Sequence, residues 1–599
     1  MNTMTKIAAG ITVLAFMLAG CAGMPKKPEV TARGDYSYTK EYVSWLARKE
    51  MKKHDVTGLS IALVDDQKVV WAEGFGYADK ADKIPAAPET IYRAGSISKL
   101  FTATAVMQLV EKDKFDIDKP LKTYLPEFSI KSRFTDAAPI TPRTLMTHHS
   151  GLPSDLLKGM WTRNPEPFEN EVNLLREEYA AYPPNYVFSY SNVGVTLLGH
   201  ALEKVAGRDF AAHMKTSVLS PLEMTHSAFS QAPDRSPLGA KAYRKAEEAE
   251  ELPLRGTPAG GLNSNVLDLS RFIQMVLAGG RAGEQQIIKP ETLAEMLRPQ
   301  NADVPLDLNF HTGLGWALSI LGNADIRNAG PVIHHSGATL YHRSMLIVLP
   351  EHKLGVVVLA NSATAGNVVN KLAAEALKLA LEAKSGIKQP DQSKAPVGEG
   401  SMSQEALKAY EGRYATMAGV IGITKKSDYL QAYLMNNSFR LVPRPDGLLG
   451  LQYRLLGIIP ISLGELDQVG ISRATVAGRE IVKASMNGQE VLVGERITPV
   501  PISEAWQTRV GEYEIANAGD DAILVDKIRL RRDNGLLQLE YAMPLFIDGR
   551  MSIAIAPLSD KEALIYGLGR GMGETIRVVT VGGEERLQYS GYLFKKKRE

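Results

Sequence analysis

The chain has 599 residues, too many for one hydrophobic core, so several domains are expected. Its composition, 44% hydrophobic and 23% charged, is that of an ordinary folded protein and excludes a disordered or fibrous chain. The 69 basic and 67 acidic residues nearly cancel, and no long basic run is interleaved with aromatic residues, which argues against a nucleic-acid partner.

The first 21 residues resemble the export signal of a bacterial lipoprotein. A short polar start is followed by a 14-residue apolar run, which is shorter than the roughly 20 residues of a membrane-spanning helix and typical of a signal peptide. The run ends in LAGC, which is similar to the lipobox whose cysteine receives a diacylglyceryl group. The resemblance implies a signal peptide over residues 1–20, a lipidated Cys21, and a polar tether over 21–35.

This anchor sets the expected location. Two or more acyl chains attach a protein stably to a membrane, so the chain is expected in the cell envelope. Ala22 follows the cysteine instead of Asp, which in Gram-negative lipoproteins implies the periplasmic face of the outer membrane. The alternative is ordinary cleavage, which would leave Cys21, the only cysteine, as a free thiol.

Hydrophobic periodicity predicts a mixed α/β (α+β) domain over residues 36–385. Strands at both ends and helices between them indicate one sheet completed by the N- and C-terminal strands. The predicted elements are strands over 59–64 and 68–74, helices over 98–112, 193–206 and 268–276, two strands around a turn at 350–352, and a helix over 370–384.

The remainder of the chain differs in character. Residues 386–404 are rich in Gly, Pro, Ser and charge, and are predicted to be a linker. Short alternating apolar stretches with frequent turns then predict an all-β region that is duplicated, with one copy over 405–500 and the other over 501–599. Two small antiparallel barrels are expected, and one larger sandwich is the alternative.

The segment AGSISKLFTATAVMQLV contains the first candidate catalytic pair, Ser96 and Lys99, at the start of a predicted amphipathic helix. Their spacing puts both side chains on one helix face. A lysine is a base only when neutral, and burial or a neighbouring cation lowers its pKa from about 10.4 by up to about 3–5 units. Two other Ser-x-x-Lys matches, at Ser37 and Ser385, lie away from any helix start predicted within a core. By itself the pair is equally compatible with a helix cap.

Tyr190 and Asn192, in FSYSNVGV, form the second element, and this is the only one of 22 tyrosines followed at the second position by Asn. A loop before a helix can direct both side chains into a cleft. Tyr190 can relay the serine proton, as a phenolate base and then as an acid, and the Asn192 amide can hold a substrate carbonyl. The alternative is that Tyr190 packs in the core with its hydroxyl bonded to backbone.

His335 and Gly337, in IHHSGA, form the third element, on a strand expected beside Ser96. Gly337 permits close backbone approach. The N–H groups of Ala338 and Ser96 then form an oxyanion hole. The same HHSG letters occur earlier, where His148 is predicted to be a structural hydrogen-bond partner, and core packing is the alternative role for His335.

In this order the three elements resemble those of serine β-lactamase-like hydrolases related to class C β-lactamases and D-Ala-D-Ala carboxypeptidases. The similarity covers about 36–385 and includes the segments TLMTHHSGLP, FSYSNVGVTLLGHALEKVAG, TPAGGLNSNVLDLSRFI and VVVLANS. It implies an antiparallel sheet flanked by helices, with a helical subdomain, and an acyl-enzyme mechanism. The implied roles are nucleophile for Ser96, proton transfer for Lys99 and Tyr190, and substrate positioning for Asn192 and His335.

Two departures from the family pattern affect the substrate. The His-Ser-Gly element replaces the more frequent Lys-Thr-Gly and is similar to the esterase and peptidase branches. Residues 341–344 stand where relatives carry Gly and an aromatic residue, which alters the strand beside the site. The all-β tail resembles relatives with lipocalin-like C-terminal domains, including some D-aminopeptidases.

The expected function is hydrolysis of an ester or amide, such as a D-amino-acid peptide, a cell-wall-derived peptide or a small ester. A β-lactamase or penicillin-binding protein is the alternative, because the same acylation serves both and the sequence does not show the deacylation rate. A non-catalytic envelope scaffold is a third reading, disfavoured because a scaffold does not need a lysine that is costly to bury. The β-tail either covers the site, limits substrate size, mediates oligomers or acts only as a spacer.

No metal or cofactor is predicted. The 11 histidines include no His-Glu-x-x-His, and phosphate-loop and dinucleotide motifs are absent from the sequence. A Gly-x-Ser-x-Gly motif is also absent, which argues against an α/β-hydrolase. The expected partners are a peptide or small-molecule substrate and a membrane reached through Cys21, and the oligomeric state stays open.

Overall fold

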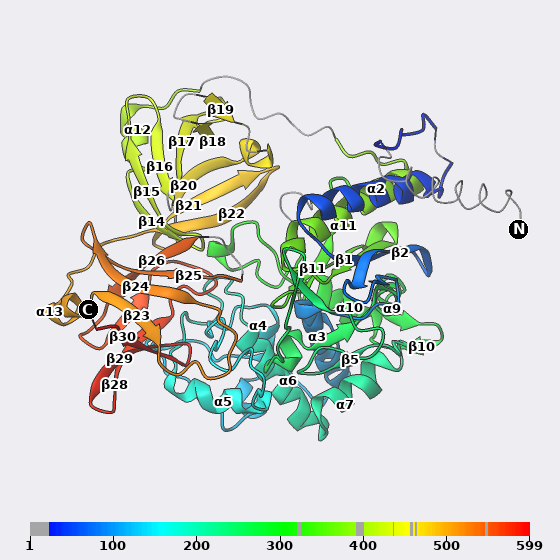
Figure 1. Cartoon of the computed structure of the whole chain (residues 1–599), viewed down its shortest axis with the longest axis horizontal. Coiled ribbons are helices and arrows are strands. Elements are labelled where there is room, and N and C mark those ends of the chain that lie inside the picture. The colour runs from blue at the N-terminus through cyan, green and yellow to red at the C-terminus, as the bar shows by residue number, and fades with distance from the viewer. Residues whose placement is uncertain are drawn as a thin grey trace, which may run out of the picture.

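A computed structural model of the chain describes residues 23–30, 32–319, 325–390, 400–434, 437–455, 459–461, 464–545 and 549–598. The predicted signal peptide and Cys21 lie outside these residues, as does the stretch 391–399 of the predicted linker. The described part consists of an N-terminal α/β domain and two β-barrels, the first drawn in yellow-green and the second in orange and red (Figure 1).

The N-terminal domain is built on a six-stranded antiparallel sheet in the order β11-β12-β13-β1-β2-β3. The sheet combines N- and C-terminal strands of the domain, as predicted, and Leu59 pairs with Ala360, so that β1 and β13 lie side by side. The strands are β1 (Gly58–Asp65), β2 (Lys68–Asp79), β3 (Ile84–Pro85), β11 (Ile333–Ala338), β12 (Arg343–Leu349) and β13 (Leu354–Ala360).

Helices cover both faces of this sheet. Ala62 and Val64 of β1 pack into the core on the side of α3 and α9, whereas Leu59, Ile61 and Leu63 pack into the core under α2 and α11. Two covered faces explain why these strands are continuously apolar instead of alternating. The helices are α2 (Ser37–Lys53), α3 (Ser98–Val110), α4 (Pro142–Met146), α5 (Glu171–Leu174), α6 (Asn192–Ala206), α7 (Phe210–Met214), α8 (Thr257–Gly260), α9 (Val266–Leu277), α10 (Pro290–Leu297) and α11 (Gly366–Ser385).

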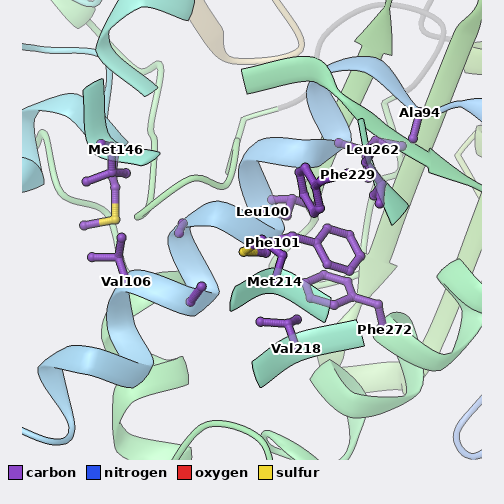
Figure 2. Packing of buried hydrophobic residues seen from close by; sticks show 14 of the residues in the cluster. Ala94, Leu100, Phe101, Val106, Met146, Met214, Val218, Phe229, Leu262 and Phe272 are labelled. Carbon is purple, nitrogen blue, oxygen red and sulfur yellow. The ribbon is translucent and has the colours of Figure 1, made fainter. Parts of the chain in front are cut away.

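Helix α3 is buried on all sides. Every residue from Ser98 to Leu109 is buried, so the predicted amphipathic character of this helix is wrong. The Phe101 ring stacks on Phe272 with ring centres 4.2 Å apart, within a cluster that surrounds the helix (Figure 2). A helix buried on every face belongs in a core, and its polar side chains bond within the protein, as Thr102 does to the Pro258 carbonyl (2.8 Å). This packing fixes the first turn of α3, which carries Lys99 and follows directly on the turn that contains Ser96.

Helix α2 corrects a second prediction. Ser37 is its first residue, so another Ser-x-x-Lys match does lie at a helix start. The Ser37 hydroxyl is exposed and donates to Asp35 (2.6 Å), and Ser385 is the last residue of α11. Burial, and not position at a helix start, therefore distinguishes Ser96 and Lys99 from the other two matches.

The C-terminal region forms two closed eight-stranded antiparallel barrels, and not one sandwich. In the first barrel a pairing of β17 with β18 closes the ring. Its strands are β14 (Gly412–Thr416), β15 (Gly419–Lys425), β16 (Leu430–Leu434), β17 (Asn437–Pro443), β18 (Leu449–Leu455), β20 (Gly470–Val476), β21 (Arg479–Met486) and β22 (Gln489–Arg496), with β19 (Ile459–Ile461) added at one edge.

The second barrel repeats the plan of the first. Each begins with a short helix, α12 (Gln404–Lys408) or α13 (Glu504–Thr508), and a tyrosine that donates to the carbonyl four residues before it, Tyr414 in one and Tyr513 in the other. The strands of the second are β23 (Gly511–Ile515), β24 (Asp526–Asp533), β25 (Leu536–Ala542), β26 (Arg550–Pro557), β27 (Glu562–Ile565), β28 (Thr575–Val581), β29 (Glu584–Tyr589) and β30 (Tyr592–Lys596).

The second barrel packs against the loops between α4 and α6. Tyr182 and Val187 of these loops share one hydrophobic cluster with the barrel interior. Arg133 donates to Glu562 (2.8 Å), and Arg577 donates to the buried Glu178 (3.2 Å). Among the described helices, none has the length and apolar character needed to cross a bilayer.

Candidate active site

Ser96 and Lys99 lie together at the start of α3. Ser96 belongs to a tight turn, Gly95–Ile97, that leads into the helix, and its Oγ is 3.2 Å from the Lys99 Nζ. The Lys99 side chain is buried, with 1% of the residue exposed. This is the contact between hydroxyl and amine expected from the sequence.

The Lys99 amine is held by two carbonyl oxygens. Its Nζ donates to Asn192 Oδ1 and to the Ala259 carbonyl, both at 2.7 Å. Burial, together with the charge of Arg570, lowers the pKa of Lys99 well below its usual range. A neutral amine has two N–H bonds and one lone pair. With both N–H bonds used, the lone pair is left for the hydroxyl of Ser96.

Tyr190 lies against both Ser96 and Lys99. Its hydroxyl is hydrogen-bonded to the Ser96 side chain, and Lys99 Nζ lies 4.9 Å from the centre of its ring. Burial raises the pKa of Tyr190 to about 12. The phenol is therefore neutral near pH 7, and of the two groups the Lys99 amine, with its lowered pKa, is the one suited to accept a proton.

Asn192 connects Lys99 to an acidic residue that the sequence analysis missed. The first residue of α6, it accepts from Lys99 and donates through Nδ2 to Asp155 Oδ1 (2.6 Å). The preceding Ser191 caps the helix by accepting from the Gly194 N–H. Binding of a substrate carbonyl by Asn192 stays a prediction, because in the structure both ends of its amide contact protein groups.

The third element, His335 and Gly337 on β11, lies against the turn that contains Ser96. A Cβ added to Gly337 would be 2.1 Å from the Ala94 carbonyl oxygen, so only glycine allows β11 to approach this closely. Gly95, whose φ is +55°, faces the same strand, and a Cβ there would be 2.7 Å from the Ala338 nitrogen. The N–H of Ala338 is thus adjacent to the Ser96 turn, the arrangement that an oxyanion hole needs.

Two histidines flank the Tyr190 ring. His335 has its ring centre 6.3 Å away, and burial and Lys99 lower its pKa to about 3, so that it is neutral. His148 packs closer, at 4.2 Å, and its Nδ1 accepts from the Ser191 N–H (3.2 Å). His148 is thus the hydrogen-bond partner expected from the sequence, and it fixes the segment that carries Tyr190.

Residues 341–344, which depart from the family pattern beside the site, are held in place by their own contacts. The Tyr341 N–H donates to the buried Glu251 (2.9 Å), and His342 Nδ1 lies 3.6 Å from the same carboxylate. Ser344 donates to the Ala94 carbonyl (2.7 Å). Ala94 directly precedes the turn Gly95–Ile97, which contains Ser96.

A small cavity opens beside Ser96. Its volume is about 40 Å³, which suffices for about three water-sized groups. Its walls are mainly apolar, with the Asp155 and Glu171 carboxylates among its lining residues. The larger apolar side chains that line it are Leu156, Met160, Trp161, Val193 and Leu254.

Arg570 reaches this site from the second barrel. Its Nη2 donates to Asp155 Oδ2 (2.9 Å), and its guanidinium carbon lies 5.1 Å from the centre of the Tyr190 ring. The only local signal for this residue is its place in the segment GLGRGMG, where glycines surround a single arginine. Sequence reasoning missed both Arg570 and Asp155.

Comparisons with known proteins show what the chain is similar to. Protein flp of Staphylococcus aureus (strain N315) is 24% identical over 329 residues, which cover 54% of this chain and 63% of flp, so the match spans less than two thirds of that relative. The mitochondrial serine beta-lactamase-like protein LACTB of Mus musculus is 25% identical, with 57% of this chain and 78% of LACTB covered.

Solved structures show the same fold beyond the N-terminal domain. The crystal structure of SurE has a TM-score of 0.55 at 22% identity and covers 77% of this chain and 100% of SurE. The structure of SurE with D-Leu has a TM-score of 0.53 at 24% identity. The family model described as Beta-lactamase matches residues 44–380, more than half of the chain and the whole span that carries Ser96, Lys99, Tyr190 and His335. This chain therefore belongs to the beta-lactamase family, whose members are typically serine hydrolases.

Proposed function

We propose that this protein hydrolyses esters or amides through an acyl-enzyme formed on Ser96. One observation carries the proposal: the buried Lys99 amine has its N–H groups held by two carbonyls and lies 3.2 Å from Ser96 Oγ. A serine hydroxyl is a weak nucleophile unless a neighbouring base accepts its proton. Lys99 is such a base because its pKa is lowered.

In acylation, Ser96 Oγ bonds to the substrate carbonyl carbon while its proton moves to Lys99 Nζ. The negative charge on the carbonyl oxygen is stabilised by the N–H groups of Ser96 and Ala338. The bond to the leaving group then breaks, and the leaving group takes the Tyr190 hydroxyl proton, which Lys99 replaces. The neutral Tyr190, hydrogen-bonded to Ser96, is suited to this transfer.

In deacylation, a water molecule bonds to the acyl carbon and gives its proton to Lys99. The bond from the acyl carbon to Ser96 Oγ breaks, and the serine regains a proton from Lys99. The free acid leaves, and Ser96, Lys99 and Tyr190 return to their starting protonation states.

The cavity supports a preference for short acyl groups, since about 40 Å³ accommodates only a few heavy atoms. D-Amino-acid derivatives are the first amides to test, because the neighbour SurE was solved with D-Leu. Short p-nitrophenyl esters and D-alanine p-nitroanilide represent the two classes.

The test of the nucleophile is labelling with a fluorophosphonate, followed by peptide mass spectrometry. We expect the label on Ser96 and none in Ser96→Ala, with hydrolysis reduced by at least about 10³-fold. Ser37→Ala, which removes the exposed serine of a similar motif, is the matched control and should behave as wild type. Unchanged hydrolysis by Ser96→Ala would overturn the proposal.

The same preparation distinguishes the alternatives. Rapid turnover of a chromogenic cephalosporin, with no turnover of esters or D-alanine p-nitroanilide, would favour a β-lactamase. If Ser96 is not labelled at all across the range from pH 6 to 10, a scaffold without catalytic activity is favoured.

A further inference from the structure

We propose that Arg570 of the second barrel is a positioning residue of the Ser96 site, which orients Asp155 and, through Asp155, the Asn192 amide that holds Lys99. The inference rests on the proposed function. It makes the second barrel a part of the catalytic centre instead of a spacer.

A continuous chain of contacts supports the inference. Arg570 Nη2 donates to one oxygen of Asp155 (2.9 Å), and Asn192 Nδ2 donates to the other (2.6 Å). Asn192 Oδ1 in turn accepts from Lys99 Nζ (2.7 Å). With both oxygens of its carboxylate engaged, Asp155 fixes which way the Asn192 amide faces. The amide therefore presents its oxygen to Lys99.

The loop that carries Arg570 is held in place by the N-terminal domain. The Tyr182 hydroxyl donates to the Gly567 carbonyl (2.9 Å), and the Ser189 hydroxyl donates to that of Gly569 (3.2 Å). On the other side of Arg570, the Gly571 N–H donates to Ser154 Oγ (2.8 Å). Three hydrogen bonds on both sides of one arginine position a side chain far more tightly than a loose surface loop does.

The backbone of this loop also depends on its composition. Gly569 and Gly571 have φ angles of +101° and +74°, which residues with side chains rarely adopt. This conformation projects Arg570 from the barrel toward Tyr190. About 47% of the Arg570 side chain stays exposed, so its charge acts at the mouth of the site and is partly screened by water.

The charged and titratable groups that face Lys99 and Arg570 act in opposite directions. Burial and Arg570 lower the pKa of Lys99, whereas Asp155 raises it. The neighbouring groups are Asp155 and His148 on the loop after α4, Tyr190 before α6, His335 on β11, Glu171 on α5, and Glu574 on the barrel. Loss of Arg570 would remove a cation and leave the Asp155 anion without its partner, and both changes favour the protonated amine.

The experiment follows the rate at which a fluorophosphonate labels Ser96 from pH 5 to 10, in the full chain. The midpoint of the rise in rate reports Lys99 deprotonation. We expect Arg570→Gln to move the midpoint upward by roughly half a unit to one unit. Arg570→Lys, which keeps the positive charge, should have a midpoint close to that of the wild type. The double variant with Asp155→Asn should return the midpoint toward the wild-type value, since the cation and the anion are removed together.

Arg577→Gln is the matched control. This arginine also joins the barrel to the N-terminal domain, through Glu178 at 3.2 Å, but is not in the chain of contacts that ends at Lys99. It should leave the midpoint unchanged. An equal shift in Arg577→Gln would mean that barrel docking alone matters, and an unchanged midpoint in Arg570→Gln would mean that Arg570 has no such role. Either result overturns the inference.

Failure of the proposed function gives a different result, because wild-type Ser96 would then resist labelling at every pH and the inference would fall with it. If Arg570→Gln does not fold, judged by near-UV circular dichroism, Asp155→Asn alone decides the matter. Removal of the anion should move the midpoint downward, and no movement would overturn the inference.

Discussion

The carboxylate of Glu574, on the second barrel, accepts a hydrogen bond of 2.8 Å from the backbone N–H of Ser154, on the N-terminal domain. Tyr589 donates to its other oxygen, also at 2.8 Å. Burial raises the pKa of Glu574 from 4.5 to about 7. A carboxyl whose pKa is raised on folding stabilises the folded state below its unfolded pKa, and this contribution is lost as the pH rises through the folded value.

We therefore predict that the free energy of unfolding falls between pH 5 and pH 8, relative to that of Glu574→Gln, by up to about 3 kcal/mol. Thermal unfolding of both proteins across this range measures the difference. Glu514→Gln, which removes an exposed carboxylate on β23, is the control, and the difference in unfolding free energy between it and wild type should not change with pH. A difference between wild type and Glu574→Gln that is constant with pH would contradict the prediction.

The rate of hydrolysis should depend on pH with a single rise. Lys99 must be neutral to accept the Ser96 proton, so kcat/KM should increase as the pH passes through its lowered pKa. Burial raises the pKa of Tyr190 to about 12, so its hydroxyl stays protonated at pH 10. We expect no fall on the alkaline side up to pH 10. A bell-shaped profile with a descending limb below pH 9 would mean that Tyr190 loses its proton far below pH 12 or that the active form needs a protonated Lys99.

The size of the cavity predicts a preference for acyl chain length. The value of kcat/KM should be at least about tenfold higher for p-nitrophenyl acetate and propionate than for p-nitrophenyl octanoate. Each methylene beyond the size of the cavity has to displace part of its wall. Met160→Ala removes part of the wall and should reduce this preference. Met417→Ala, at an exposed position on the first barrel, should not change it. Faster hydrolysis of octanoate by the wild type would refute the size limit.

We also propose that Cys21 carries a lipid anchor in the cell envelope. Expression in a Gram-negative host with radiolabelled palmitate should label the wild-type chain and bring it to the outer-membrane fraction. Cys21→Ser should lose the label and leave that fraction. Incorporation of label into Cys21→Ser would show that the acyl group is attached elsewhere.

Much of the fold could be predicted because local pattern sets it. Strand β1 and helix α6 are marked by apolar runs and by end residues such as Gly207, whose left-handed φ of +65° ends the helix. The positions of the apolar runs predicted that N- and C-terminal strands share one sheet, but not that β1 pairs with β13. The prediction of an amphipathic α3 was wrong because its polar residues, such as Thr102 and Thr104, are buried together with its apolar ones.

The candidate site likewise contains some residues that the sequence predicted and others that it did not. Ser96, Lys99, Tyr190, Asn192 and His335 stand in recognisable short motifs, and the structure brings them together. Asp155 and Arg570 are 415 residues apart and meet only because two domains dock. No local periodicity records a contact between domains, so neither residue could be assigned from the sequence.

The pairing of β1 with β13 has a consequence for the order of folding. During synthesis β1 emerges some three hundred residues before its partner on one side, Leu354–Ala360. Until then the strand has an open edge, and open edges are where chains join to one another incorrectly. Contacts of such long sequence separation also slow folding. A ribosome-bound fragment that ends before β13 should therefore need a chaperone to prevent aggregation. A longer fragment, in which β13 pairs with β1, should not need it.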